Sequence, residues 1–320
     1  MNNSNLNEMG YLNFLYCFDE KYNQQAFSSI ISLLDCVSEK INIYVIYNKT
    51  FNNEYLPRKI RNHKKLNTIK FLIFQDINNE FPNIQNSHLT EATYYRLFIE
   101  KYVPNNINYL TYIDSDIICL KNPIIEIKEK IKILKASPNI FMARTEYKKS
   151  SKKENKIYER LDMDGPYFNA GFLIINIEKW RKNNLTENLI IKMNKLSKSI
   201  LHWDQDVLNS YFDGKYIEIE NKFNFNAYDK RNEVKNLEEI IFLHYVGSKK
   251  PWVLSGIFNK FSEYYHYNFR KINNKYYHIT HTWKRNSMYI FVNSLLKLKI
   301  LNLKYPLMFL KDFVKSFKND

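Results

Sequence analysis

The chain has 320 residues, of which 45% are hydrophobic, so it can bury a large core, and none of its apolar runs approaches the roughly 20 residues that a membrane-spanning helix needs. Its formal net charge of +15 is unevenly placed, because eleven Lys and Arg against two Asp give the segment from Arg270 onward a net charge of +9. Cys17, Cys36 and Cys119 show no C-x-x-C spacing, which excludes that motif for zinc or redox chemistry. The polar start lacks the pattern of a secretion signal, and these features together predict a cytoplasmic protein.

The first two-thirds of the chain alternates strand-like and helix-like patterns. Runs rich in β-branched and aromatic residues predict buried strands over 11–18, 41–47, 69–74 and 109–113, and helical spacing of apolar residues predicts helices over 25–37 and 90–102. Such alternation predicts an α/β fold with a mixed, mostly parallel sheet flanked by helices. Ligands of such sheets bind beyond the carboxyl ends of the strands. Asp19 and Asp114 both follow predicted strands, so we expect them at one edge of the sheet.

The second half of the chain is less regular. Residues 146–159 are polar and charged and predict a surface loop, whereas 168–177 predict an apolar strand and 178–183 the start of a helix. Leucines and phenylalanines occur among lysines from 287 to 318, and Pro306 should divide this tail into two helices. We therefore expect one α/β domain over residues 1–256 and a basic, amphipathic C-terminal region over residues 257–320.

The strongest chemical motif is Asp114-Ser115-Asp116 at the end of a predicted strand. Side chains two apart in a strand point to the same side, so both carboxylates could chelate a hard divalent cation that also bridges a diphosphate. A solvated turn is the alternative, because Asp-x-Asp is common by chance. The chain has only six glycines and neither a G-x-G-x-x-G nor a G-x-x-x-x-G-K run, so a bound nucleotide phosphate must be held by metal and side chains.

Three later blocks place polar residues beside apolar patterns. In the first, Asn169-Ala170-Gly171 predicts a turn that leads into an apolar strand and offers an amide to a sugar hydroxyl. In the second, Trp203-Asp204-Gln205-Asp206 precedes a helical pattern. In the third, His244 lies three residues before Gly247 and six before Lys250, a side chain suited to phosphate. Each block alone is also compatible with a turn or with core packing.

Together and in this order, the blocks resemble glycosyltransferase family 8, which contains bacterial lipopolysaccharide galactosyl- and glucosyltransferases and glycogenin. The resemblance covers about residues 11–256 and also rests on Arg96 within 93–97 and on the Lys-Pro-Trp sequence at 250–252. It implies a nucleotide-diphospho-sugar transferase (GT-A) fold for the catalytic domain, residues 1–256. It also implies that a hexose, galactose or glucose, passes with retained configuration from a UDP-sugar to a glycan acceptor such as a lipopolysaccharide or lipooligosaccharide.

The resemblance further implies roles for single residues. Asp114, Asp116 and His244 would bind Mn²⁺ or Mg²⁺. Asp204 and Gln205 would be the catalytic residues, with Gln205 supporting the cationic anomeric centre while the acceptor attacks from the face that UDP leaves. His88 and Glu146 would line the acceptor or donor pocket. The contacts to the UDP-sugar would come from Asp19, Arg96, Ser115, Asn169, Ala170, Asp204, Gln205, Gly247 and Lys250.

Two positions depart from the family pattern. After the first strand the family often has Asp-Asp-Asn-Tyr, whereas this chain has Asp19-Glu20-Lys21-Tyr22 and so lacks that asparagine as a nucleotide contact. Glu146 stands where relatives often carry an aspartate, which would alter the hexose that fits. Neither departure touches the expected metal ligands.

Two other functional classes are weighed against the transferase. The positive charge and the 25 tyrosines would suit a nucleic-acid-binding protein, but the charge concentrates in the tail and no recognised nucleic-acid module is present. An Asp-x-Asp phosphatase would need a second aspartate two residues after Asp19, where Lys21 stands. For the transferase, we expect a UDP-hexose, a glycan acceptor that can be lipid-linked and no nucleic acid as partners. The tail either binds the anionic inner face of the cytoplasmic membrane or packs on the domain as a helical cap.

Overall fold

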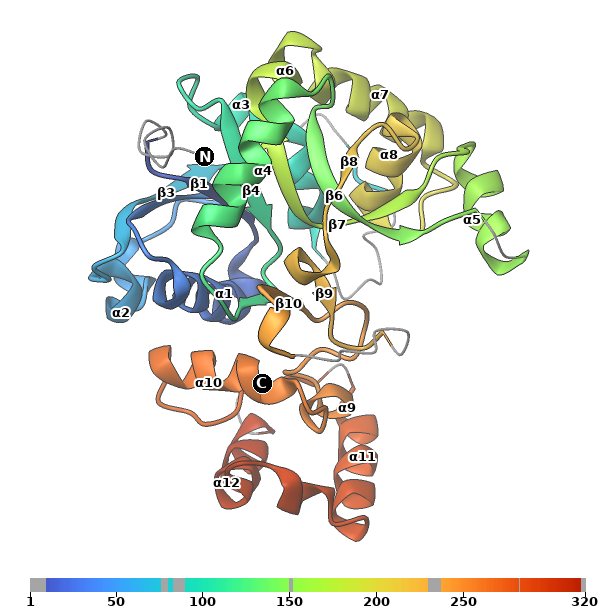
Figure 1. The fold of residues 1–320 in the computed structure, drawn as a ribbon. Helices are drawn as coiled ribbons and strands as arrows, with labels where there is room; N and C mark the ends of the chain where they lie inside the picture. The colour runs from blue at the N-terminus through green and yellow to red at the C-terminus, as the bar shows by residue number, and fades with distance from the viewer. Residues whose placement is uncertain are drawn as a thin grey trace.

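A computed structural model describes residues 10–75, 80–82, 90–149, 152–229, 237–281 and 283–317. Its main sheet has seven strands in the order β3-β2-β1-β4-β7-β6-β8, and β7 runs antiparallel to its two neighbours β4 and β6 (Figure 1). The predicted mixed, mostly parallel sheet is therefore confirmed. The strands are β1 Asn13–Cys17, β2 Ile41–Tyr47, β3 Leu66–Ile73, β4 Tyr109–Ile113, β6 Phe141–Tyr147, β7 Tyr167–Asn176 and β8 Ile217–Glu218.

Helices cover both faces of this sheet, as the sequence predicts. Successive residues of β1 alternate between the two apolar cores, with Phe14 and Tyr16 on one face and Leu15 and Cys17 on the other. The first face packs against α1 (Asn23–Cys36), α2 (Arg58–Arg61) and α4 (Ile124–Ala136). The second packs against η4 (Glu91–Phe98), α3 (Ile99–Tyr102), α6 (Ile177–Lys182), α7 (Leu185–Leu196) and α8 (Trp203–Phe212).

A second sheet, which the sequence did not predict, joins three short strands in the order β5-β10-β9. They are β5 (Ile117–Cys119), β9 (Phe225–Asn226) and β10 (Phe242–His244). β10 pairs antiparallel with β5 and parallel with β9. Because β5 follows β4 after a three-residue turn, this small sheet brings the late strands β9 and β10 to the carboxyl edge of the main sheet.

Two local predictions need correction. The stretch 146–159 is not a loop throughout, because α5 covers Lys152–Leu161. Tyr158 and Leu161, three residues apart, form one buried side of this helix against Met163 and Tyr167. The helix predicted over 90–102 is a 3₁₀ helix over its first part, η4, and becomes α-helical only in α3. Four short 3₁₀ segments complete this part of the chain, namely η2 Glu20–Tyr22, η3 Asn53–Tyr55, η5 Asn221–Phe223 and η6 Leu237–Glu239.

The C-terminal helices lie on one side of the main sheet, in orange to red at the bottom of Figure 1. They are α9 (Leu254–Ile257), α10 (Ser262–Ile272), α11 (Lys284–Leu296), η7 (Lys299–Asn302) and α12 (Pro306–Ser316). Pro306 begins α12, so the predicted division of the tail is confirmed. α10 packs along α1, whereas Ile257 of α9 shares a small apolar cluster with Ile300, Phe309 and Phe313. The domain boundary after residue 256 stays a prediction.

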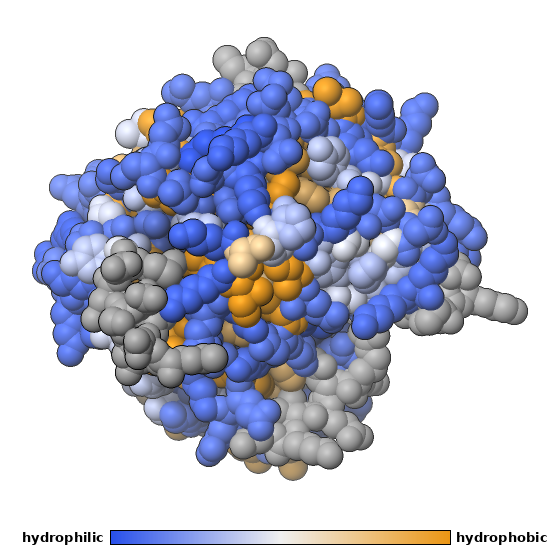
Figure 2. All heavy atoms as spheres, turned by 45° about the horizontal axis from the view of Figure 1, so that its top comes forward, coloured by the Kyte–Doolittle hydropathy of each residue, from blue (hydrophilic) through white to orange (hydrophobic). Residues whose placement is uncertain are grey.

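The outer surface agrees with a folded domain that packs its apolar residues inward. Figure 2, in which the top of Figure 1 is turned toward the viewer, shows a mostly hydrophilic face, with the largest apolar patch near the middle and smaller apolar spots elsewhere. Within the described ranges, no helix combines the length and the apolar character that a bilayer crossing requires.

Candidate functional site

The carboxyl ends of β1 and β4 lie side by side, because these strands are parallel neighbours in the main sheet. β1 ends directly before Phe18 and Asp19, and β4 ends directly before Asp114. The prediction that Asp19 and Asp114 share one edge of the sheet is confirmed. A cavity of about 470 Å³ opens at this edge.

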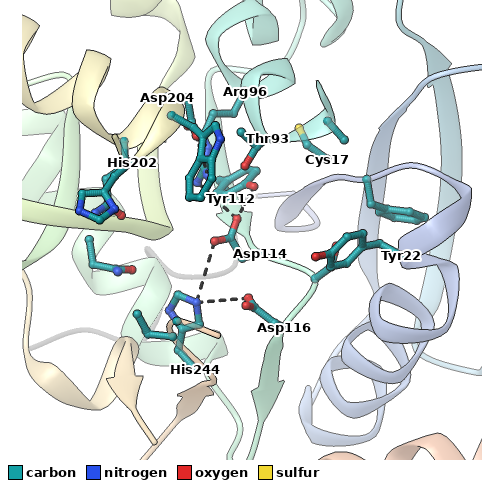
Figure 3. A pocket seen from close by; sticks show the side chains of 18 of the residues that line it. Cys17, Tyr22, Thr93, Arg96, Tyr112, Asp114, Asp116, His202, Asp204 and His244 are labelled. Carbon is teal, nitrogen blue, oxygen red and sulfur yellow. Dashed lines mark hydrogen bonds and ion pairs between the residues drawn. The ribbon is translucent and has the colours of Figure 1, made fainter. Parts of the chain in front are cut away.

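The two carboxylates of the Asp-x-Asp motif face one imidazole (Figure 3). Asp114, Ser115 and Asp116 form a turn after β4, closed by a 3.2 Å hydrogen bond from Ile117 N to Asp114 O, so the strand geometry expected for them is wrong. The Nε2 atom of His244 nevertheless lies 4.0 Å from Asp114 Oδ2 and 3.2 Å from Asp116 Oδ1. One ligand atom of each residue lies within 4.8 Å of the others.

The small sheet delivers His244 to this position. In the antiparallel pair of β5 and β10, His244 lies opposite Ile117, the residue after Asp116. Tyr245 N also donates a 3.2 Å hydrogen bond to Asp116 O, which fixes the two segments next to the carboxylate. His244 is buried, so its imidazole has little freedom to turn away.

Gly171 leaves the space that this cluster needs. Its carbonyl accepts a 2.8 Å hydrogen bond from Asp114 N, which holds β7 against the turn. A Cβ atom at Gly171 would stand 2.3 Å from His244 Cε1 and 2.9 Å from Asp114 Oδ2. Two carboxylates and one imidazole around such a space suit a divalent cation such as Mn²⁺ or Mg²⁺. The residues present therefore fit the metal that the sequence implies.

Arg96 lies buried between two carboxylates on the other side of Asp114 (Figure 3). Its guanidinium pairs with Asp204 and lies 3.3 Å from Asp114 Oδ1, and it stacks 4.6 Å from the centre of the Tyr112 ring. Tyr112 Oη donates a further hydrogen bond to Asp114 Oδ1. Burial raises the pKa of Asp204 to about 7, while the Arg96 guanidinium opposes that rise. Arg96 thus offsets the negative charge of Asp114 and Asp204 in the floor of the cavity.

Lys250 pairs with the second carboxylate of the Asp-x-Asp motif, that of Asp116. Its ammonium pairs with Asp116 Oδ2 and donates a 2.6 Å hydrogen bond to Tyr245 O. Burial alone would raise the pKa of Asp116, but the Lys250 ammonium opposes that rise and holds the pKa well below its usual range. Asp116 therefore stays ionised, as a metal ligand must be.

The amide of Gln205 has a fixed orientation. Tyr167 Oη donates its only hydrogen to Asp206 Oδ1, 2.8 Å away. The Tyr167 oxygen can therefore only accept from Gln205, so the Gln205 atom that lies 3.0 Å from it must be the donor, Nε2. Gln205 Oε1 consequently faces the backbone N–H of Ala170, 3.0 Å away. Since a carbonyl oxygen has two lone pairs, Oε1 keeps one for a ligand in the cavity that Gln205 lines.

Asn169 and Glu146 form a second pair of polar groups on the cavity wall. Asn169 Nδ2 donates to Glu146 Oε2 across 3.2 Å, and Asn169 Oδ1 accepts from Gly171 N across 3.0 Å. Both side chains line the cavity. Asn169 and Gly171 belong to β7 itself, so the turn predicted at 169–171 is wrong, and Glu146 comes from the neighbouring strand β6.

Of the remaining predicted residues, some line the cavity and others do not. Ser115 lines the cavity with a buried hydroxyl that has no hydrogen-bond partner within the described ranges, and Gly247 lines it in a left-handed backbone conformation with φ of 82°. Ala170 contributes backbone contacts only, to Gln205 and Arg96. Asp19 caps η2 through Lys21 N and is not among the lining residues described. His88 lies outside the described residues.

Sequence reasoning missed several residues of the site. Asn224, which contacts His244, stands in an asparagine-rich stretch that offers no signal. His202 directly precedes the predicted block at 203–206 and could have been added to it. Thr93, Trp203, Val246 and Ser248 stand inside predicted blocks, where no role was assigned to them. The other missed lining residues are mostly aromatic or small, and burial patterns alone do not separate them from the core: Cys17, Phe18, Tyr22, Thr90, Ala92, Tyr112, Tyr147 and Tyr167.

Comparisons with known proteins agree with this fold. The chain is 30% identical over 251 residues to a lipopolysaccharide 1,3-galactosyltransferase of Salmonella typhimurium, covering 75% of this chain and 72% of that protein. It is 27% identical over 263 residues to a lipopolysaccharide 1,2-glucosyltransferase of Escherichia coli, covering 77% and 75%. Among solved structures, the galactosyltransferase LgtC in complex with donor and acceptor sugar analogues has the same fold, with a TM-score of 0.67 and 19% identity over 86% of this chain and all of that one.

The family assignment rests on the catalytic part of the chain. The model of glycosyl transferase family 8 matches residues 13–255, which span the main sheet, the small sheet and every predicted block described above. The GT-A fold seen in the structural neighbours is the fold that the resemblance implies. The chain therefore belongs to glycosyltransferase family 8.

Proposed function

We propose that this glycosyltransferase moves galactose or glucose from a UDP-sugar to a glycan acceptor, in a reaction that depends on Mn²⁺ and retains the anomeric configuration. The main observation behind this proposal is that a single cavity is lined both by the cluster of Asp114, Asp116 and His244 and by the polar side chains of Asp204 and Gln205. A nucleotide-diphospho-sugar needs a cation beside its diphosphate and polar side chains around its sugar, and this cavity offers both kinds of group. The relatives act as lipopolysaccharide galactosyl- and glucosyltransferases, which supports a hexose donor and a lipopolysaccharide, lipooligosaccharide or other cell-surface glycan as acceptor.

The metal side of the cavity would bind the diphosphate. Asp114, Asp116 and His244 would hold the cation, which when bound would neutralise negative charge on the leaving UDP. Lys250 already lies against Asp116 and is the cationic side chain best placed to contact a phosphate oxygen. Ser115 Oγ offers a buried donor that has no protein partner within the described ranges. These groups would stabilise the negative charge that develops on the diphosphate as it leaves.

The opposite wall would bind the hexose. The hydrogen bonds to Ala170 N and Tyr167 Oη hold Gln205 so that its carbonyl oxygen has one lone pair left for the cationic anomeric carbon. The acceptor oxygen would form its bond to that carbon on the face from which the UDP oxygen departs, and the hydroxyl proton would pass to a leaving phosphate oxygen. Asp204, held by Arg96, and Asn169, held by Gly171 N, would orient the sugar hydroxyls.

The C-terminal region would attach the enzyme to an anionic membrane surface, where a lipid-linked acceptor lies. About half of the exposed large apolar side chains in the described ranges lie between Trp283 and Val314. Leu296, Leu298 and Leu301 are 79%, 65% and 66% exposed, and Lys297 and Lys299 stand between them in the sequence. Exposed leucines next to lysines suit an interface of acyl chains and anionic headgroups. This supports peripheral attachment to the inner face of the cytoplasmic membrane.

The proposal is tested by measuring UDP release from a panel of donors. The full-length protein would be incubated with Mn²⁺ and UDP-galactose, UDP-glucose, UDP-N-acetylglucosamine or UDP-N-acetylgalactosamine. We expect UDP release from one of the two hexose donors, and we expect EDTA to stop it. If UDP is released from none of the four, or if EDTA leaves the rate unchanged, the proposed function is wrong.

A further inference from the structure

The ring nitrogen of His244 that faces away from Asp114 and Asp116 contacts a buried side chain, that of Asn224. His244 Nδ1 lies 2.8 Å from Asn224 Oδ1. Asn224 follows η5 and precedes β9, the strand that runs parallel to β10, so the backbone of the small sheet fixes the separation of the two residues. Asn224 has no exposed surface. Its amide therefore must find both of its partners within the protein.

The orientation of the Asn224 amide follows from a backbone group. Gly171 N can only donate, and it lies 3.0 Å from Asn169, so the atom of Asn169 at that position must be the carbonyl oxygen, Oδ1. Asn224 approaches the same oxygen at 2.8 Å and must present its Nδ2 there. The Asn224 atom that faces His244 is then its carbonyl oxygen. No choice of amide rotamer is left open.

This orientation fixes the proton on the imidazole. Because Asn224 Oδ1 can only accept, His244 Nδ1 must carry the hydrogen of the 2.8 Å contact. The neutral ring then has its lone pair on Nε2, the nitrogen that lies 3.2 Å from Asp116 Oδ1 and 4.0 Å from Asp114 Oδ2. A metal-binding histidine needs its lone pair on the nitrogen that faces the metal.

The same hydrogen bonds continue to the sugar side of the cavity. His244 donates to Asn224, Asn224 donates to Asn169, and Asn169 donates through Nδ2 to Glu146 Oε2 at 3.2 Å. All three bonds point the same way and end on a carboxylate that can only accept when ionised. Bonds aligned in this manner polarise one another, which strengthens the one at His244.

We propose that Asn224 is a positioning residue that holds His244 in its Nδ1–H tautomer and keeps Nε2 open to the cation, through a hydrogen-bond chain that runs from His244 to Glu146. The proposal rests on the metal-dependent function proposed above. Asn224 touches neither substrate nor metal and acts through His244. Loss of such an outer partner weakens metal affinity by about 10- to 100-fold in other metal sites.

The first test compares Mn²⁺ binding to the full-length protein and three variants, by electron paramagnetic resonance of free Mn²⁺. Asn224→Leu has a similar size but no acceptor, and its Kd for Mn²⁺ should rise about 10- to 100-fold. Asn224→Asp keeps an oxygen toward His244 and, in its protonated form, a donor toward Asn169 Oδ1, so its Kd should lie nearer the unsubstituted value than that of Asn224→Leu. Asn268→Leu removes another buried amide, in α10 and outside the site, and should not change the Kd. Thermal unfolding without metal shows that each variant is folded.

The second test needs no metal. The ¹⁵N chemical shifts of the His244 ring nitrogens report which nitrogen is protonated, and they should show Nδ1–H in the unsubstituted protein and a mixture of tautomers in Asn224→Leu. An Nε2–H tautomer in the unsubstituted protein, or Mn²⁺ binding by Asn224→Leu as tight as without the substitution, overturns the role of Asn224. If the unsubstituted protein binds no Mn²⁺ while His244 is in the Nδ1–H form, the proposed metal function fails and the tautomer assignment stands.

Discussion

The Nε2 atom of His244 lies 3.2 Å from Asp116 Oδ1 because the β5–β10 ladder places His244 opposite Ile117, next to Asp116 in sequence. The two residues belong to distant parts of the chain, and backbone pairing rather than side-chain contact sets their distance. A site built on paired strands holds its ligands in position before any cation arrives, so less ordering is needed when one binds.

The carboxylates of the cluster give the first prediction. Asp114→Asn and Asp116→Asn each replace an anionic ligand by a neutral amide of the same size, so UDP release should fall by roughly 10²-fold or more while the fold remains. EDTA should have the same effect on the unsubstituted protein, and added Mn²⁺ should restore the rate. Asp162→Asn, an exposed position outside the cavity, serves as the control. Full turnover of either site variant would remove the proposed metal centre.

Gly171 gives the second prediction. An added methyl group in Gly171→Ala would stand 2.3 Å from His244 Cε1, so the imidazole must move out of line with the two carboxylates. We expect weaker Mn²⁺ binding by at least about tenfold, measured by calorimetric titration, together with a loss of stability of about 1–3 kcal/mol from overpacking, which should leave the protein folded. Gly10→Ala, where an added Cβ meets nothing within 4 Å, is the matched control. Unchanged Mn²⁺ affinity in Gly171→Ala would show that His244 is not a ligand.

Gln205 gives the third prediction. If its carbonyl only supports the anomeric centre, Gln205→Ala should lower kcat by about 10- to 100-fold without abolishing transfer, and the product should keep the configuration of the donor. The linkage is read by NMR of the purified product. An inverted linkage in either protein would contradict the proposed retention.

The parts of the site that the sequence predicts are those whose chemistry shows in short patterns. Asp114 and Asp116 follow an apolar strand, and His244 stands within a block that the family shares, so all three could be named from the sequence alone. Asn224 could not, because its role comes from a backbone pairing and its stretch is rich in asparagine. The helix α5 was missed for a related reason: among its described side chains, those of 156–161, only Tyr158 and Leu161 are buried, and their partner Tyr167 lies beyond the helix.

A buried histidine gives the fourth prediction. His266 is fully buried and donates through Nε2 to Pro251 O at 2.9 Å, and burial, with His278 nearby, lowers its pKa to about 3. In the unfolded chain the pKa is about 6.5, so the unfolded state binds the proton first. Stability is therefore complete above about pH 6.5 and falls as the pH drops toward 3, by up to about 1.4 kcal/mol per pH unit for this residue.

Urea denaturation between about pH 7 and pH 4.5 measures that slope. His266→Gln keeps a donor for Pro251 O but cannot titrate, so its free energy of unfolding should fall less steeply as the pH is lowered. The same dependence on pH in both proteins would show that His266 is not responsible for the acid sensitivity.

The last prediction concerns the C-terminal region. Removing it whole is a poor test, because Ile300, Phe309 and Phe313 pack over Ile257 in α9 and their loss would expose that residue. Surface substitutions avoid this. The triple variant Leu296→Ser, Leu298→Ser, Leu301→Ser removes three exposed apolar side chains and leaves the cluster intact.

The full-length protein should sediment with vesicles of phosphatidylglycerol and phosphatidylethanolamine at low salt, and the triple serine variant should not, while UDP release stays unchanged in both. Replacing Lys297 and Lys299 by Gln should weaken vesicle binding about fivefold per charge, since each lysine near an anionic surface contributes about 1 kcal/mol. Ile125→Ser, at an exposed position of α4, is the control. If the unsubstituted protein does not bind the vesicles, or if the triple variant binds equally well, the exposed leucines do not form a membrane contact. The C-terminal helices would then serve only as a cap on α9, through the apolar cluster that they share with it.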